Sequence, residues 1–246
     1  MRAASGTCLA IDAILQVMNL LYAFYERRAL NAFVENDFLK ARDLFSKMLK
    51  KWPQRIGIRH NLGLVYVALR DFSAAETCFL KDLEDYGESL SRYRALADLY
   101  FSWGQAGKAA FHYEKALAMA RAEGPTSQLE FQADLNFMVR RLAICKKDSA
   151  FIRAMDGDAA LQRGLEAQNN KNWELAYKEF AAAVEADPTN FPAWNNRGSI
   201  AMNIYKDYTE AERCFTEAAR LSAAPAIRHN IALVQTMQKE GIKKGR

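Results

Sequence analysis

The chain has 246 residues, of which 50% are hydrophobic and 26% are charged, as is typical of a folded protein. This composition excludes an intrinsically disordered chain, whose apolar content would be too low to form a core. The net charge of +5 comes largely from the last eight residues, where four basic side chains face one acidic one. The remaining charge is too small to indicate nucleic acid as a partner, and none is expected.

The first predicted element is an apolar run from Cys8 to Tyr25, in which neither Gly nor Pro interrupts a helix. Three interpretations compete: a helix buried against the protein or a partner, a membrane anchor over residues 8–25, and a cleaved signal peptide. The polar stripe of Asp12, Gln16 and Asn19 argues against insertion, since an Asp at the centre of a bilayer helix costs about 2.5–3.5 kcal/mol.

A signal peptide is disfavoured because Arg2 is the one basic residue before the run and no small-residue cleavage site follows it. We therefore favour a helix that packs against the next element or a partner protein. Its predicted contact residues are Ile11, Ile14, Leu15, Met18 and Leu21.

Downstream, small residues recur at a fixed period. Within each half of the chain, alanines are spaced by 34 or 35 residues and followed four residues later by Phe or Tyr: Ala41, Ala75, Ala109, Ala176 and Ala211. A short polar break precedes each alanine, and a second set of small residues lies before the breaks: Gly63, Ala97, Gly164 and Gly198. This period predicts antiparallel helix pairs that meet at small residues and stack on their neighbours.

The pattern resembles the tetratricopeptide repeat, a helix-turn-helix unit of 34 residues, over roughly residues 22–123 and 157–246. The aromatic residue expected three positions after the small one is present as Tyr66 and Tyr100 but is replaced by Ala167 and Ala201. The resemblance implies an all-α superhelical solenoid of antiparallel helix pairs. In such a fold a concave groove binds an extended peptide or a helix of a partner protein.

Residues 124–156 have the length of one repeat but lack its motif. Gly124 and Pro125 break the chain, and the run from Thr126 to Lys147 predicts one long helix that packs on the third repeat. We expect a continuous stack here, and the alternative is a joint between two subdomains. Further on, IRHNIALV at 227–234 nearly repeats IRHNLGLV at 58–65, but no second helix follows it. This predicts a capping helix with a disordered basic tail.

The predicted organisation has five parts. An apolar N-terminal helix covers residues 1–25, and three repeats cover 22–123. A long helix or degenerate repeat covers 124–156, two repeats cover 157–224, and the capping helix with its tail covers 225–246.

The resemblance places the first helix of each repeat along the groove. The residues expected to line it are His60, Asn61, Arg94, Asp98, Phe101, Asn195, Asn196, Met202, His229 and Asn230. Asn61, Asn196 and Asn230 carry amides that can hydrogen-bond a peptide backbone, although solvated positions without a ligand fit them equally well. The carboxylate clamp of chaperone-binding members is not expected, because Glu26 and Leu30 stand where its lysine and asparagine should be.

The sequence contains no nucleotide-binding, hydrolase or zinc-protease motif, and its three histidines lie far apart. We therefore expect no enzymatic activity, no catalytic residue, no metal site and no cofactor. The four cysteines have no CxxC spacing, which predicts buried, reduced thiols in the cytoplasm or another reducing compartment.

These observations predict a non-enzymatic scaffold or adaptor that binds a partner protein and acts as a subunit of a larger complex. The alternative is a membrane-tethered assembly factor or co-chaperone, anchored through residues 8–25. The partner and the oligomeric state stay open.

Overall fold

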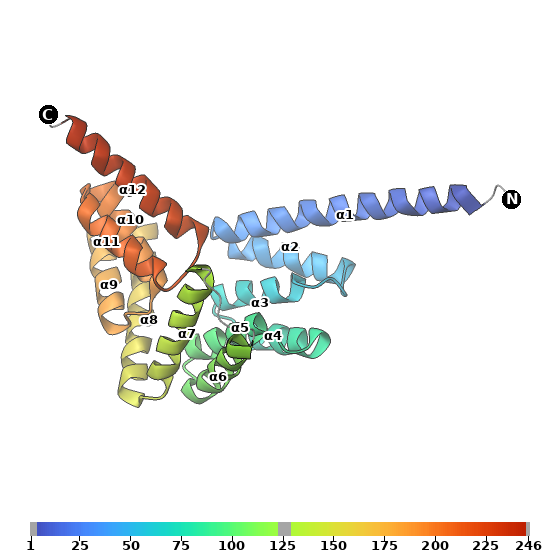
Figure 1. Cartoon of the computed structure of the whole chain (residues 1–246), viewed down its shortest axis with the longest axis horizontal. Helices are drawn as coiled ribbons and strands as arrows, with labels where there is room; N and C mark the ends of the chain where they lie inside the picture. The colour runs from blue at the N-terminus through green and yellow to red at the C-terminus, as the bar shows by residue number, and fades with distance from the viewer. Residues whose placement is uncertain (1–3, 123–128, 245–246) are drawn as a thin grey trace. The chain divides into compact units, whose positions relative to one another are not determined.

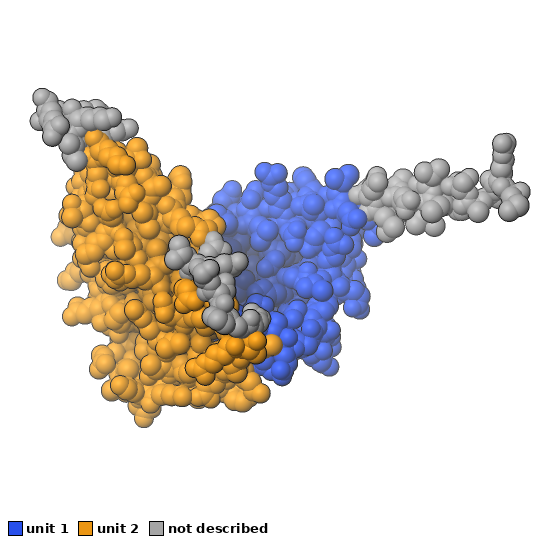
Figure 2. Space-filling view, in the orientation of Figure 1, with its two compact units in different colours: residues 1–99 blue, residues 100–246 orange. Residues whose placement is uncertain are grey.

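The structure is a computed structural model that describes the backbone of residues 4–122 and 129–244 and the side chains of residues 18–122 and 131–239. The regular structure of these residues is helical, which confirms the all-α prediction. The chain divides into two compact units, residues 1–99 and 100–246, coloured blue and orange in Figure 2. Each unit is described by itself.

In the first unit the first four helices pack each on the next along the chain (Figure 1). It contains α1 (Ala4–Val34), α2 (Phe38–Lys51), α3 (Ile58–Ala68), α4 (Phe72–Tyr86) and the start of α5 (Leu90–Ser102). The prediction of one uninterrupted helix from Cys8 through Tyr25 is confirmed, and the helix runs on to Val34.

The second unit takes in the end of α5 and the remaining helices, and from α6 onward neighbours along the chain contact one another. These elements are α6 (Ala106–Ala122), α7 (Leu129–Cys145), α8 (Asp148–Asn169), α9 (Trp173–Ala186), α10 (Phe191–Ile200), the π-helical turn η1 (Ala201–Tyr205), α11 (Tyr208–Ala219) and α12 (Pro225–Lys244).

The polar breaks in the sequence are tight helix-helix turns of one geometry. In four of them a non-glycine residue with φ of 57–61° is followed by an Asp or Asn, the pairs being Asn36-Asp37, Arg70-Asp71, Lys171-Asn172 and Lys206-Asp207. The second residue caps the next helix, because its side chain accepts a hydrogen bond from a backbone N–H three residues on, at 3.0–3.2 Å. In the third repeat Gly104, with φ of 79°, takes the left-handed position.

The small residues form the helix-helix seams that the periodicity predicted. All five alanines of the first set have no exposed surface, and the glycines of the second set are buried. A Cβ atom on Gly63 would lie 2.5 Å from the Phe79 ring, and one on Gly164 would lie 2.6 Å from the Phe180 ring. The aromatic residue four positions after each alanine therefore fills the space that the glycine leaves.

The π-helical turn accounts for the longer spacing in the second half. Gly63 precedes Ala75 by 12 residues, whereas Gly198 precedes Ala211 by 13. The extra residue falls in η1, where the Asp207 N–H donates to the Ala201 carbonyl at 3.0 Å, one residue further back than in the matching turn at Asp71 and Tyr66. A π turn absorbs a one-residue insertion without breaking the helix.

The region without a repeat motif forms α7 and the start of α8. As predicted, α7 packs on α6, the second helix of the third repeat. The region's last residues are also helical, because α8 begins at Asp148 and continues without a break to Asn169. Arg141 of α7 pairs with the buried Asp187 at 3.0 Å, which ties α7 to the α9–α10 loop. Residues 123–128 lie outside the described part of the chain.

At the other end of the second unit, α12 packs on α11. Val234 is fully buried against a cluster that includes Ala211 and Phe215. The helix continues to Lys244, so the prediction of a disordered basic tail was wrong for most of that segment.

Candidate functional site

The residues expected to bind a partner lie on the first helices of the repeats, but the structure gathers few of them. His60 and Asn61 lie on α3, and Arg94 and Asp98 lie in the part of α5 that belongs to the first unit. The others belong to the second unit, at the end of α5 and on α10, η1 and α12: Phe101, Asn195, Asn196, Met202, His229 and Asn230.

In the second unit the structure joins two of the predicted asparagines. The Asn230 Nδ2 of α12 donates to the Asn195 Oδ1 of α10 at 3.0 Å, and both side chains are half-buried. This bond fixes the orientation of both amides. It leaves the amino group of Asn195 and the carbonyl of Asn230 as groups that can meet a peptide backbone.

The other predicted residues of the second unit differ in exposure. Asn196 is half-buried and His229 is exposed. Met202 is 3% exposed and packs in the cluster that contains Phe215, while Phe101 is 2% exposed and packs edge-on against Phe151. Met202 and Phe101 therefore lie in the core rather than on an accessible binding surface.

In the first unit His60 is a packing residue as well as a polar one. Its ring lies 5.6 Å from that of Phe79, and burial lowers the pKa of its imidazole below the usual value of 6.5. Arg94 and Asp98 form an ion pair of 3.6 Å along α5, and Asn61 is half-buried.

The N-terminal helix α1 has one face in the core and one outside it. Tyr22, Ala29 and Ala32 are buried toward α2, whereas Leu20 is 72% exposed, Phe24 is 56% exposed and Val34 is 78% exposed. The last three share one face of the helix because residues 4 and 14 apart return to the same side. We call Leu20, Phe24 and Val34 the outer face of α1.

Of the contact residues predicted on this helix, Met18 is 43% exposed and Leu21 is half-buried. The side chains of Ile11, Ile14 and Leu15 lie outside the described residues. Asn19, from the predicted polar stripe, accepts a hydrogen bond from Arg55 at 3.3 Å, and the Arg55 guanidinium lies over the Tyr22 ring.

In the part of the chain that the structure describes, no helix combines the length and apolar content needed to span a membrane. Nor do three or more His, Cys, Asp or Glu side chains of the described residues gather where a metal ion could be held.

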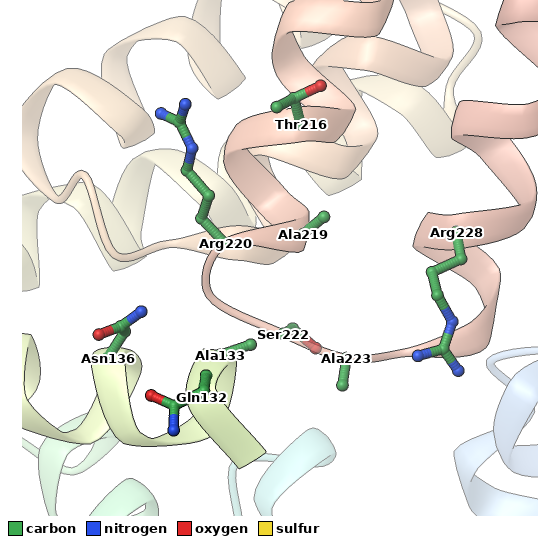
Figure 3. A pocket seen from close by; sticks show the side chains of 9 residues that line it. All are labelled: Gln132, Ala133, Asn136, Thr216, Ala219, Arg220, Ser222, Ala223 and Arg228. Atoms are coloured by element: carbon green, nitrogen blue, oxygen red, sulfur yellow. The ribbon is translucent and has the colours of Figure 1, made fainter. Parts of the chain in front are cut away.

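Sequence reasoning missed a cavity of about 410 Å³ in the second unit (Figure 3). It lies between α7, α11 and the start of α12, and its polar lining residues are Gln132, Asn136, Thr216, Arg220, Ser222 and Arg228. None belongs to a repeat motif, and the cavity forms only when α7 packs beside the α11–α12 loop. No pattern in the sequence would have indicated it.

Comparison with known proteins identifies the repeat. The tetratricopeptide repeat family model matches residues 91–123, which correspond to α5 and α6. Superkiller complex protein 3 from Homo sapiens is 28% identical to this chain over 233 residues. The match covers 87% of this chain and 15% of that protein, so the chain spans about one seventh of the relative.

Solved structures that match this chain include the TPR2AB domain of yeast Sti1 in its pHSP90 complex. It is 14% identical with a TM-score of 0.43, and the match covers 90% of this chain and 86% of that one. Another is the APC/C hetero-tetramer Cut9-Hcn1, at 11% identity and a TM-score of 0.45, with 87% of this chain and 42% of that one covered.

Proposed function

We propose that this tetratricopeptide-repeat protein is a non-enzymatic adaptor that works as a subunit of a larger protein complex. The observation that carries the proposal is the exposed outer face of α1. Soluble proteins expose scattered apolar residues, but Leu20, Phe24 and Val34 are large, more than half exposed and aligned on one helix. We assign this face to contact with a partner protein.

The packing of the repeat helices supports a partner that is a protein rather than a small substrate. The first helices α3, α8 and α10 each pack on one helix before them and one after them in the chain, whereas α1 packs on α2 and leaves Leu20, Phe24 and Val34 exposed. A helix of a partner, laid along α1 with its own apolar stripe, would continue the stack in the way repeats cover one another.

The asparagine pair supplies a second contact for the same or another partner. Asn195 and Asn230 are held in one orientation by their mutual hydrogen bond, so binding a peptide backbone would require little further ordering. We infer that this pair, with Asn196 and His229 nearby on the same helices, hydrogen-bonds an extended segment. Phe101 and Met202 are left out of the binding surface because they are buried.

The state of the thiols supports the predicted reducing compartment, such as the cytoplasm. Cys214 is buried, and burial raises the pKa of its thiol to about 12. Burial also raises the pKa of the Cys78 thiol to about 11. Both thiols stay protonated near neutral pH, which suits structural rather than redox roles.

Affinity purification from cells that express the full chain tests the proposal. We expect the unchanged chain to recover a partner protein in a constant ratio to itself. A variant with Leu20→Asp, Phe24→Asp and Val34→Asp should lose that partner. Ile152→Asp is the matched control, because Ile152 is 62% exposed on α8. Circular dichroism should show the same helix content in all three proteins, since the changed side chains are exposed.

An identical set of partners with the triple variant would contradict the assignment of α1. In that case the double variant Asn195→Ala and Asn230→Ala decides whether the asparagine pair carries the contact. Extraction of membranes with carbonate distinguishes the proposed subunit from a membrane-tethered assembly factor. A protein-bound subunit is released into the supernatant, whereas a membrane-tethered protein stays in the membrane fraction.

A further inference from the structure

The outer face of α1 belongs to a longer stripe that has the spacing of a coiled-coil seam. From Leu20 to Val34, alternating steps of four and three residues pass through Phe24, Arg27 and Asn31. All five side chains are exposed, and they lie on the side of the helix away from the face that is buried toward α2. Steps of four and three residues are the repeat by which one helix packs along another. We call these five residues the seam of α1.

Arg27 places a positive charge at the middle of this seam. Its exposed side chain forms no ion pair with the residues that the structure describes. A helix brings together side chains three and four residues apart, and at those distances from Arg27 no residue is acidic: they are Ala23, Phe24, Leu30 and Asn31. The seam therefore offers a cation between two apolar ends.

The nearby acidic residues do not occupy Arg27. Residues 18–34 hold two arginines and one acidic residue, Glu26, so this segment stays positive. Glu26 is half-buried, and its carboxylate accepts a hydrogen bond from the Tyr22 hydroxyl at 2.7 Å. Glu35 follows the end of the helix, about 12 Å beyond Arg27 along its axis, which exceeds the Debye length of about 8 Å at physiological salt.

The position of Arg27 argues against a second copy of this chain as the occupant. Two copies that paired in parallel and in register, or antiparallel about the middle of the seam, would bring one Arg27 against the other. Like charges that face each other in an interface are unfavourable. A helix of another protein that carries a carboxylate at this level would instead gain an ion pair between two apolar contacts.

We propose that the seam of α1 pairs with an acidic amphipathic helix of a partner protein. Leucine or isoleucine side chains of that helix meet the outer face of α1, and a glutamate or aspartate meets Arg27. This inference rests on the proposed function and adds the chemistry that selects the partner. The apolar contacts supply affinity, whereas the polar position within the seam sets the register and excludes helices without the acidic residue.

Fluorescence anisotropy with the full chain and three designed peptides tests this proposal. Each probe is a labelled peptide of about 22 residues, long enough to form a helix. It has Leu at every seam position except the central one, which is Glu, Gln or Lys. The central residue meets Arg27 in either orientation of the peptide. We expect the Glu probe to bind about tenfold more tightly than the Gln probe, and the Lys probe to bind most weakly.

Charge reversal locates the binding. Arg27→Glu should bind the Lys probe about tenfold more tightly than the Glu probe, because the new carboxylate attracts the opposite charge. Arg153→Glu, the same change at an exposed arginine of α8, is the matched control and should keep the preference for the Glu probe. The triple variant of the outer face should bind none of the probes. Circular dichroism should show the same helix content in all of these proteins.

Equal binding of the Glu and Gln probes by the unchanged chain would overturn the proposal, as would a preference that Arg27→Glu does not reverse. Sedimentation of the chain alone as a dimer that the triple variant dissociates would also overturn it, because a second copy would then be the occupant. These failures differ from a failure of the proposed function. If the triple variant loses its cellular partner while Arg27→Glu keeps it, the outer face docks a partner that is not selected by an acidic residue.

Discussion

Two nearly identical octapeptides occupy different surroundings in this protein, IRHNLGLV at 58–65 in α3 and IRHNIALV at 227–234 in α12. Both bury the same two positions: Ile58 and Ile227 are 1% and 3% exposed, and Val65 and Val234 are fully buried. The opposite side differs, since Gly63 is buried beneath Phe79 whereas Ala232 is exposed.

The difference comes from the helix that follows. After α3, the second helix α4 brings Phe79 over Gly63 and beside His60. At the matching positions of α12, Ala232 and His229 are exposed. The side with Ile58 or Ile227 is thus buried in both helices. The side with Gly63 or Ala232 is buried only where a second helix packs over it.

The largest expected effect lies on the shared side. Ile58→Ala and Ile227→Ala should each reduce the free energy of unfolding by about 2–5 kcal/mol, because both remove a buried side chain and leave a cavity. Urea denaturation of the two variants measures this. A loss at Ile58 without one at Ile227 would show that α12 is not packed as a true repeat helix.

The next effect separates the two sides. Gly63→Leu should destabilise the protein by about 1–3 kcal/mol or more, since even a Cβ atom there would lie 2.5 Å from the Phe79 ring. Ala232→Leu at the matching position is the control, and its exposed side chain should change stability by less than about 0.5 kcal/mol. Similar losses in thermal melts of both variants would contradict the contrast between the octapeptides.

The fold was largely predictable because helix-helix seams restrict residue size. Ala75, Ala176 and their equivalents must be small wherever two helices touch, so a recurring small residue marks each seam in the sequence itself. The π-helical turn η1 was not predicted, although it holds the extra residue that makes one spacing 35 residues rather than 34.

The candidate site was less predictable, because exposure depends on what packs beyond a helix. Met202 was expected on a binding surface, but its side chain joins the cluster beneath α12. Asn195 and Asn230 were both selected, yet their hydrogen bond depends on how α10 and α12 approach one another. The cavity at Arg220 and Arg228 joins segments that no periodicity relates.

The asparagines of the octapeptides give a smaller contrast. Asn230→Ala should cost about 0.5–1.5 kcal/mol, because it removes the hydrogen bond to Asn195. Asn61→Ala is the matched change in α3, where the Asn61 side chain has no hydrogen bond to the described residues. Its cost should be below about 0.5 kcal/mol. Paired urea titrations measure both, and equal losses would remove the distinction.

The smallest expected effect concerns the two histidines. Burial against Phe79 lowers the pKa of His60 below 6.5, with Arg92 lowering it further and Asp82 opposing the shift. Above pH 6.5 His60 is largely neutral in the folded and the unfolded chain, and it contributes no pH dependence. As the pH falls below that value, the unfolded chain takes up the proton first, so the free energy of unfolding decreases until the pH passes the folded pKa.

His60→Gln removes this contribution, and between pH 8 and pH 5 its stability should fall less than that of the unchanged chain. His229→Gln is the control, because His229 is the matching residue of α12 and its side chain is exposed. The difference between the two variants isolates His60 from the other titrating groups, which both proteins share. If the two variants follow the same curve from pH 8 to pH 5, then α4 does not bury His60, and the contrast between the octapeptides is confined to Gly63.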